Sequence, residues 1–237
     1  MIASTMSGAS SVNVRPISHK RRNRDMIGSD VKGDLRVTWI DTIPYAAATG
    51  RLKQLYDRVK GPDDRVDNIM MAHSLRPHSM DGHMAIYKNA IHHGANTVPK
   101  WFLETLGVLV SGLNGCQYCV DHHFAGLQRL LANDARAAGI RAALERRSFA
   151  EVFTPREQTA LHYAVTLTCN AAAVDRFNID AMRTAGFDDG QILEINQVVA
   201  YFAYANRTVL GLGVTTDGDV LGLSPGNSQD PHDWSHR

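Results

Sequence analysis

Residues 114–123 read NGCQYCVDHH and hold the side chains best suited to chemistry in this chain. Cys116 and Cys119 are three positions apart, and His123 follows the second cysteine by four. Two thiols at this spacing on a helix share a face, so their sulfur atoms can approach to form a disulfide. An imidazole one turn further along can accept a thiol proton, which is how a cysteine nucleophile is activated. The segment therefore predicts redox chemistry at a dithiol.

The start of the helix that carries the dithiol strengthens this interpretation. Asn114 and Gly115 form a helix stop, so a new helix is expected to begin near Cys116. Free N–H groups and the positive end of the helix dipole favour a thiolate there. Tyr118 lies between the two cysteines and has a reference pKa of about 10. It is a poor base at neutral pH, and is either a hydrogen-bond donor or a packing residue.

Glu104 is the one charged residue in the apolar stretch WFLETLGVLV, twelve residues before Cys116. A carboxylate in such a setting is either solvated or buried with a partner. If the helices on either side of Asn114 pack antiparallel, Glu104 can face His123 and orient its ring. The result would be a Glu–His–Cys chain of proton-transfer groups.

Other residues offer competing interpretations. His122 is off the Cys119 face and is expected to lie in water. A zinc site would need further ligands, and Cys169, His92 and His93 are the available candidates. None has tight ligand spacing, so zinc ranks below redox chemistry. Cys169 is expected to be a buried, inert thiol.

The elements that position these residues are helical, because strand-like alternation is scarce and apolar residues recur at helical spacing. Thr154 and Glu157 predict a capping box, and Asn178 predicts another helix start. Helices are expected within 49–64, 76–94, 97–115, 116–131, 133–144, 154–169, 178–186 and 188–213. The last is apolar around most of its circumference and should be buried in the core or at a subunit contact. The fold class predicted is all-α, over residues 38–223.

The two ends of the chain differ from this domain in composition. Residues 1–37 hold seven Lys/Arg and three Asp/Glu and predict a basic, poorly ordered extension. Residues 224–237 are rich in Pro, Gly, Asn, Asp and His and predict a disordered tail. The formal net charge of +1 gives no reason to expect nucleic acid or a membrane surface as a partner. No apolar run is long enough for a transmembrane helix, and three cysteines do not make a secreted disulfide framework, so a cytoplasmic location is expected.

The pattern of Glu104, Cys116, Cys119 and His123, E-x11-C-x-x-C-x-x-x-H, resembles the alkylhydroperoxidase D (AhpD) family. That family lies within the carboxymuconolactone decarboxylase superfamily. Segments 39–57, 68–80 and 192–207 also look like its peroxidase-related branch, and the resemblance covers about 38–214. It implies an all-α AhpD-like fold and a homo-oligomer, from dimer to hexamer. It also implies peroxidase activity on hydroperoxides without haem or metal.

The same resemblance implies a role for each site residue. Cys119 would attack the peroxide, Cys116 would resolve the sulfenic acid, and Glu104 with His123 would relay the proton. No cofactor is implied beyond the redox-active disulfide, which an external dithiol or protein reductant of unknown identity would reduce. Tyr118 departs from the best-studied members, which carry a histidine between the cysteines, and is at most an auxiliary residue.

A thiol–disulfide oxidoreductase, or a redox sensor without physiological peroxidase turnover, is the alternative. The peroxidase and this alternative both predict a reversible Cys116–Cys119 disulfide. Only the peroxidase predicts fast loss of thiols when peroxide is added. Lactone decarboxylation ranks lower because that chemistry needs no dithiol. A metal-binding protein ranks last.

Overall fold

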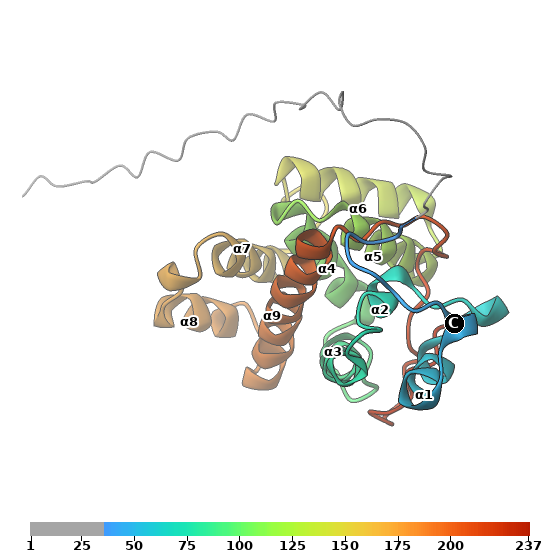
Figure 1. Cartoon of the computed structure of the whole chain (residues 1–237). Helices are drawn as coiled ribbons and strands as arrows, with labels where there is room; N and C mark the ends of the chain where they lie inside the picture. Colours follow the sequence, from blue (N-terminus) through green and yellow to red (C-terminus); the bar gives the residue numbers. More distant parts are fainter. Residues whose placement is uncertain (1–35) are drawn as a thin grey trace, which may run out of the picture. The chain divides into compact units, whose positions relative to one another are not determined.

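The computed structural model describes residues 36–237, and Figure 1 shows their arrangement. The extension predicted over 1–37 lies outside the described residues, except for its last two positions. Within the described part the regular structure is helical, with no strand, which confirms the predicted all-α fold. None of these helices is long and apolar enough to cross a membrane. The α-helices are α1 Gly50–Val59, α2 Asn68–Met71, α3 Pro77–Ile91, α4 Lys100–Leu113, α5 Gln117–Leu131, α6 Asp134–Arg146, α7 Pro155–Cys169, α8 Arg176–Thr184 and α9 Asp189–Leu212.

Local sequence signals explain several helix ends. The predicted capping box is present at α7, where the Thr154 side chain accepts from the Glu157 N–H and Glu157 accepts from the Thr154 N–H. The prediction that Asn178 caps α8 is wrong by one turn. Asp175 is the N-cap, and its carboxylate accepts hydrogen bonds from the first turn of α8. Asn178 instead closes the box by accepting from the Asp175 N–H, because its amide sits at the third helical position.

The core is built around α4, which packs against α5, α7 and α9. The contact between α4 and α9 needs a glycine, because a Cβ at Gly107 would lie 2.3 Å from the Phe202 ring. Ile195, Val198 and Phe202 of α9 are fully buried. The last helix therefore lies in the core, one of the two settings that its sequence predicted. α4 and α5 are joined at Asn114–Gly115, so Glu104 and the dithiol end up on neighbouring helices.

The chain after α9, residues 214–237, packs back against the helices and is called here the C-terminal segment. This corrects the prediction of a disordered tail from Ser224. Trp234 is buried, and the Arg58 guanidinium of α1 lies 3.7 Å from the centroid of its ring. The buried Lys88 ammonium of α3 donates hydrogen bonds to the Gly226 carbonyl and, at 3.2 Å, to the Ser228 hydroxyl. Burial of Trp234 and the hydrogen bonds from Lys88 hold the segment against the helices, although its composition is polar.

Candidate active site

The dithiol lies at the start of α5, as the sequence predicts. Cys116 is the N-cap residue and Cys119 is in the first turn, with their sulfur atoms 2.8 Å apart. Gly115 has a φ of +72°, a left-handed conformation that glycine adopts without strain, and it makes the turn from α4. Both thiols are buried. The pair is therefore positioned for disulfide formation and shielded from bulk water.

The hydrogen bond between the two thiols separates their acidities. This contact lowers the pKa of Cys116 and, together with burial, raises the pKa of Cys119 well above its usual range. A hydrogen bond from Asn206 of α9 further lowers the pKa of Cys116. When one proton is lost from the pair, the negative charge thus rests at the helix N-terminus, where the dipole favours it.

Glu104 and His123 form a hydrogen-bonded pair between α4 and α5. The distance from Glu104 Oε2 to His123 Nδ1 is 2.7 Å, and Glu104 is 2% exposed. A carboxylate only accepts, so Nδ1 carries the proton and Nε2 is left as the basic nitrogen. His92 Nε2 lies 3.8 Å from the other carboxylate oxygen. The pairing expected from the spacing is present, and it leaves His123 in the tautomer of a general base.

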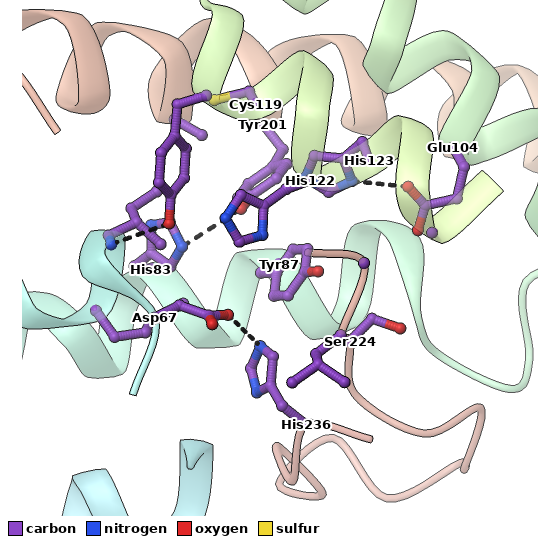
Figure 2. A pocket seen from close by; sticks show the side chains of 17 residues that line it. Asp67, His83, Tyr87, Glu104, Cys119, His122, His123, Tyr201, Ser224 and His236 are labelled. Carbon is purple, nitrogen blue, oxygen red and sulfur yellow. Dashed lines mark hydrogen bonds and ion pairs between the residues drawn. The ribbon is translucent and has the colours of Figure 1, made fainter. Parts of the chain in front are cut away.

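A cavity of about 40 Å³ connects these groups, and Figure 2 shows its walls. Cys119 lines it and Cys116 does not. Glu104 and His123 line it beside Cys119, while the C-terminal segment forms part of its wall with Gly222, Leu223, Ser224 and His236. A volume of this size holds a few water molecules or one small polar ligand. Cys119 is therefore the sulfur that a small molecule in the cavity would meet.

His122 is buried, so the prediction that it lies in water is wrong. Its Nε2 is 3.1 Å from Asp219 Oδ2, and its ring stacks on Tyr118 with centroids 4.5 Å apart. The error arises because Asp219 belongs to the C-terminal segment, which covers this face of α5. Sequence spacing within α5 contains no information about that cover.

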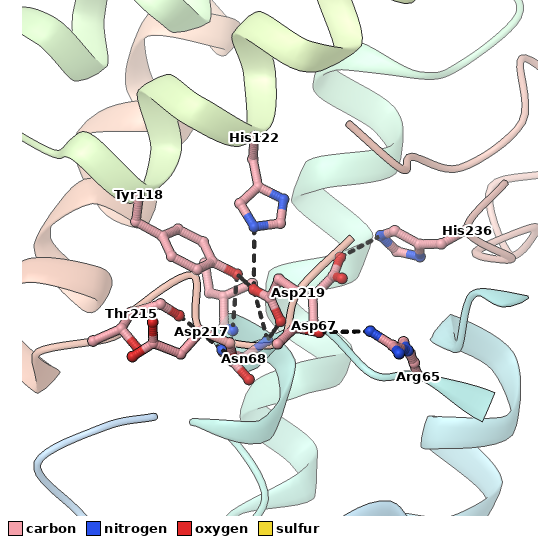
Figure 3. A network of polar contacts seen from close by, with 11 residues as sticks. Arg65, Asp67, Asn68, Tyr118, His122, Thr215, Asp217, Asp219 and His236 are labelled. Carbon is pink, nitrogen blue, oxygen red and sulfur yellow. Dashed lines mark hydrogen bonds and ion pairs between the residues drawn. The ribbon is translucent and has the colours of Figure 1, made fainter. Parts of the chain in front are cut away.

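Tyr118 belongs to the same polar network, drawn in Figure 3. Its hydroxyl donates to Asp219 Oδ2 at 2.8 Å and accepts from the Ile69 N–H at 3.2 Å. The Asn68 N–H donates to the other Asp219 oxygen at 3.0 Å. Burial raises the pKa of Tyr118 well above its usual range, which keeps the phenol protonated. Of the two roles open for Tyr118, the structure favours the hydrogen-bond donor.

Asp67 and His236 also line the cavity, and sequence reasoning missed both. His236 Nε2 lies 3.8 Å from Asp67 Oδ2. Burial raises the pKa of Asp67 to about 7, with His122 opposing and Asp219 reinforcing the shift. Burial also lowers the pKa of His236 to about 4, so this imidazole is neutral at physiological pH. An acidic group that titrates near neutrality therefore faces the cavity.

Cys169 is not part of this site. It lies exposed at the end of α7, which corrects the prediction of a buried thiol. The predicted core position fails because residues 165–168 of α7 are only half-buried and Cys169 itself is exposed. Among residues 36–237, no three His, Cys, Asp or Glu side chains are grouped so that they could hold a metal ion.

Comparison with solved structures identifies the fold. A peroxidase-related protein from Ralstonia eutropha JMP134, described as an alkylhydroperoxidase AhpD core, matches with a TM-score of 0.66 at 21% identity, over 76% of this chain and 92% of that one. A peroxidase-related protein from Silicibacter sp. TM1040 matches with a TM-score of 0.67 at 20% identity, over 78% and 95%. The debrominase Bmp8 matches with a TM-score of 0.60 at 17% identity, over 77% and 92%. No protein-family model and no curated protein matches the chain.

The chain thus has an AhpD-like fold, as its dithiol motif predicts. The similar structures include a protein named as a debrominase beside the peroxidase-related ones, so the fold alone does not fix the reaction.

Proposed function

We propose that this protein is a thiol-dependent peroxidase that reduces hydroperoxides through a Cys116–Cys119 dithiol–disulfide cycle. One observation carries the proposal. Cys119, half of a close dithiol, and the Glu104–His123 pair face the same buried cavity. A nucleophile beside an oriented base is the arrangement that thiol chemistry needs. The peroxidase-related names of similar structures agree with this choice.

The oxidative half of the cycle uses both sulfurs. His123 Nε2, directly or through one water, takes the proton of Cys119, while Glu104 stabilises the resulting imidazolium. The Cys119 thiolate attacks the terminal oxygen of the hydroperoxide, the O–O bond breaks, and protonation of the leaving oxygen gives an alcohol or water. Cys119 is left as a sulfenic acid. Cys116 then attacks its sulfur, the disulfide forms, and water leaves.

The reductive half follows from the acidities of the two thiols. An external dithiol, small or protein-borne, attacks the Cys119 sulfur because only that sulfur lines the cavity. Cys116 leaves as a thiolate, and its lowered pKa makes it the better leaving group. The second thiol of the reductant then attacks the reductant's own sulfur in the mixed disulfide, so the reductant closes its disulfide and Cys119 leaves as a thiolate. The same sulfur thus meets first the oxidant and then the reductant. No cofactor takes part in this cycle.

The volume of the cavity limits the size of the substrate. About 40 Å³ suits hydrogen peroxide or a short alkyl hydroperoxide. A bulky hydroperoxide, like any reductant larger than the cavity, would have to displace the C-terminal segment. We therefore place small hydroperoxides first in the substrate class.

A thiol–disulfide oxidoreductase or redox sensor is the second candidate. The raised pKa of Cys119 favours it, because the thiol that faces the cavity is then a weak nucleophile until its proton is removed. Such a protein would form the same disulfide by exchange and would react slowly with peroxide.

Stopped-flow oxidation by hydrogen peroxide separates the two candidates. The reduced protein, with Cys169→Ser to remove the exposed thiol, is expected to lose two thiols rapidly. Cys116→Ser should stop at a trapped sulfenic acid, and Cys119→Ser should not react. Peroxide consumption by Cys119→Ser at the parent rate would refute the assignment. Slow oxidation of the parent with ready exchange against dithiols would establish the second candidate.

A further inference from the structure

One side of the cavity has no role in the cycle described above. Figure 2 shows Cys119 and Asp67 on opposite sides, with the Glu104–His123 pair on the Cys119 side. Asp67 directly precedes α2, and its side chain is 12% exposed. A carboxyl group that faces a buried cavity next to a reactive thiol needs an explanation.

The carboxyl group of Asp67 is not engaged by its neighbours. No described residue donates a hydrogen bond to it, and its nearest ion-pair partner, His236 Nε2, is 3.8 Å away, beyond hydrogen-bonding range. Asp219 differs, because it accepts from the Asn68 N–H, the Tyr118 hydroxyl and His122 Nε2. Asp219 is thus a saturated acceptor, while Asp67 is free to bond to a molecule in the cavity.

The groups around Asp67 raise its pKa, so the carboxyl group holds its proton up to near-neutral pH. Those that face it are His122 and Tyr118 of α5, Tyr87 of α3, and Asp219 and His236 of the C-terminal segment. Burial is the largest influence on its pKa, and the nearby Asp219 carboxylate adds to it. His122 acts in the opposite direction. The result, a pKa of about 7, is the value at which a carboxyl group can both give and regain a proton.

We propose that Asp67 is the general acid of the cycle, which gives its proton to the leaving oxygen when the Cys119 thiolate attacks a hydroperoxide. This inference rests on the proposed peroxidase function. The new S–O bond forms at the terminal oxygen, and the electron pair of the broken O–O bond goes to the other oxygen. That oxygen takes the proton of Asp67 and leaves as alcohol or water. Asp67 becomes a carboxylate and regains the proton that His123 removed from Cys119.

Two oxidants of different leaving group test this role. With hydrogen peroxide the leaving oxygen is strongly basic and needs a proton, whereas peracetic acid releases acetate, which needs none. Sulfenic acid formation is measured by stopped flow in the Cys116→Ser, Cys169→Ser background. Asp67→Asn is expected to slow the reaction with hydrogen peroxide about 10²-fold and to change that with peracetic acid by less than about threefold.

The matched control is Asp63→Asn, an exposed aspartate four residues earlier, which should leave both rates unchanged. Equal slowing with the two oxidants in Asp67→Asn would indicate a structural effect and overturn the assignment. An unchanged rate with hydrogen peroxide would overturn it as well. If the Cys116→Ser, Cys169→Ser protein reacts with neither oxidant, the proposed peroxidase function is refuted. The assignment of Asp67 as its general acid is then refuted too.

Discussion

Glu104 Oε2 and His123 Nδ1 lie 2.7 Å apart, although the two residues are nineteen positions apart in the chain. The pair joins α4 to α5 across the turn that Gly115 makes, and it places the free His123 nitrogen at the cavity that Cys119 lines. Because Glu104 is buried, the strength of this hydrogen bond is not diluted by water. The orientation of the His123 ring therefore depends on the packing of α4 against α5.

Glu104→Gln should weaken the base without removing the shape. The amide fills the same volume, but the negative charge that stabilises the imidazolium is lost. The rate of sulfenic acid formation is expected to fall about 10²-fold, and the pKa of the Cys119 thiol should rise. Iodoacetamide alkylation as a function of pH, in the Cys116→Ser, Cys169→Ser background, measures that pKa. Glu151→Gln, at a side chain 71% exposed, is the control. An unchanged alkylation profile in Glu104→Gln would contradict the relay.

Cys169 should be the fast-reacting thiol of the native protein. It is exposed, whereas Cys116 and Cys119 are buried. An aromatic disulfide reagent is expected to titrate one thiol rapidly in the folded chain and three in denaturant. Cys169→Ser should abolish the fast phase and change the free energy of unfolding by less than about 0.5 kcal/mol. A fast phase that survives in this variant would mean that the dithiol is open to large reagents.

Asp67 should make stability fall with rising pH. Its pKa is about 7 in the folded protein, against a reference of 3.8. Between these values the folded state holds more protons than the unfolded state, so the contribution of Asp67 decreases as the pH rises from about 4 to 7. Asp67→Asn lacks this titrating group and does not show the loss. The free energy of unfolding of the variant minus that of the parent should therefore rise by about 2–3 kcal/mol from pH 5 to pH 8. Urea unfolding of both proteins at the two pH values gives the difference. A difference that does not vary with pH would contradict the raised pKa.

Lys88 should hold the C-terminal segment in place. Its buried ammonium donates to Gly226, Ser228 and the His92 carbonyl. Lys88→Met leaves those acceptors without a donor and is expected to cost about 1–3 kcal/mol. Amide exchange over 224–237 should accelerate more than exchange in α4. Arg176→Met, on an exposed ion pair, provides the comparison and should cost little. Equal exchange in both variants would show that Lys88 does not anchor the segment.

Much of the fold and half of the site could be predicted from the sequence. Helical spacing and caps are local signals, so they predict the helix that contains the cysteines and the end of the helix before it. The Glu104–His123 pairing was also predictable, because two consecutive helices joined by a tight turn leave few relative arrangements.

The remaining features of the site depend on contacts between segments that are far apart in the sequence. Asp67 and Asp219 lie in loops, where no periodicity reveals which face they occupy. The composition of residues 224–237 predicted disorder, because such scales average over the segment and give little weight to the single Trp234. The predictions for His122 and Cys169 fail for related reasons. Whether another segment covers a helical position, or whether the last turn of a helix passes beyond the core, is decided by tertiary packing.

The contribution of the C-terminal segment to the cavity wall has a consequence for biosynthesis. Arg129 of α5 donates to the Leu221 and Gly222 carbonyls, and His236 is more than a hundred residues beyond Cys119. At ordinary rates of translation, residues 214–237 leave the ribosome on the order of 10 seconds after α5. During that interval the nascent dithiol lacks its cover and meets whatever oxidant the surroundings hold. Reducing conditions at the ribosome therefore govern whether the chain matures as a dithiol or already carries a disulfide.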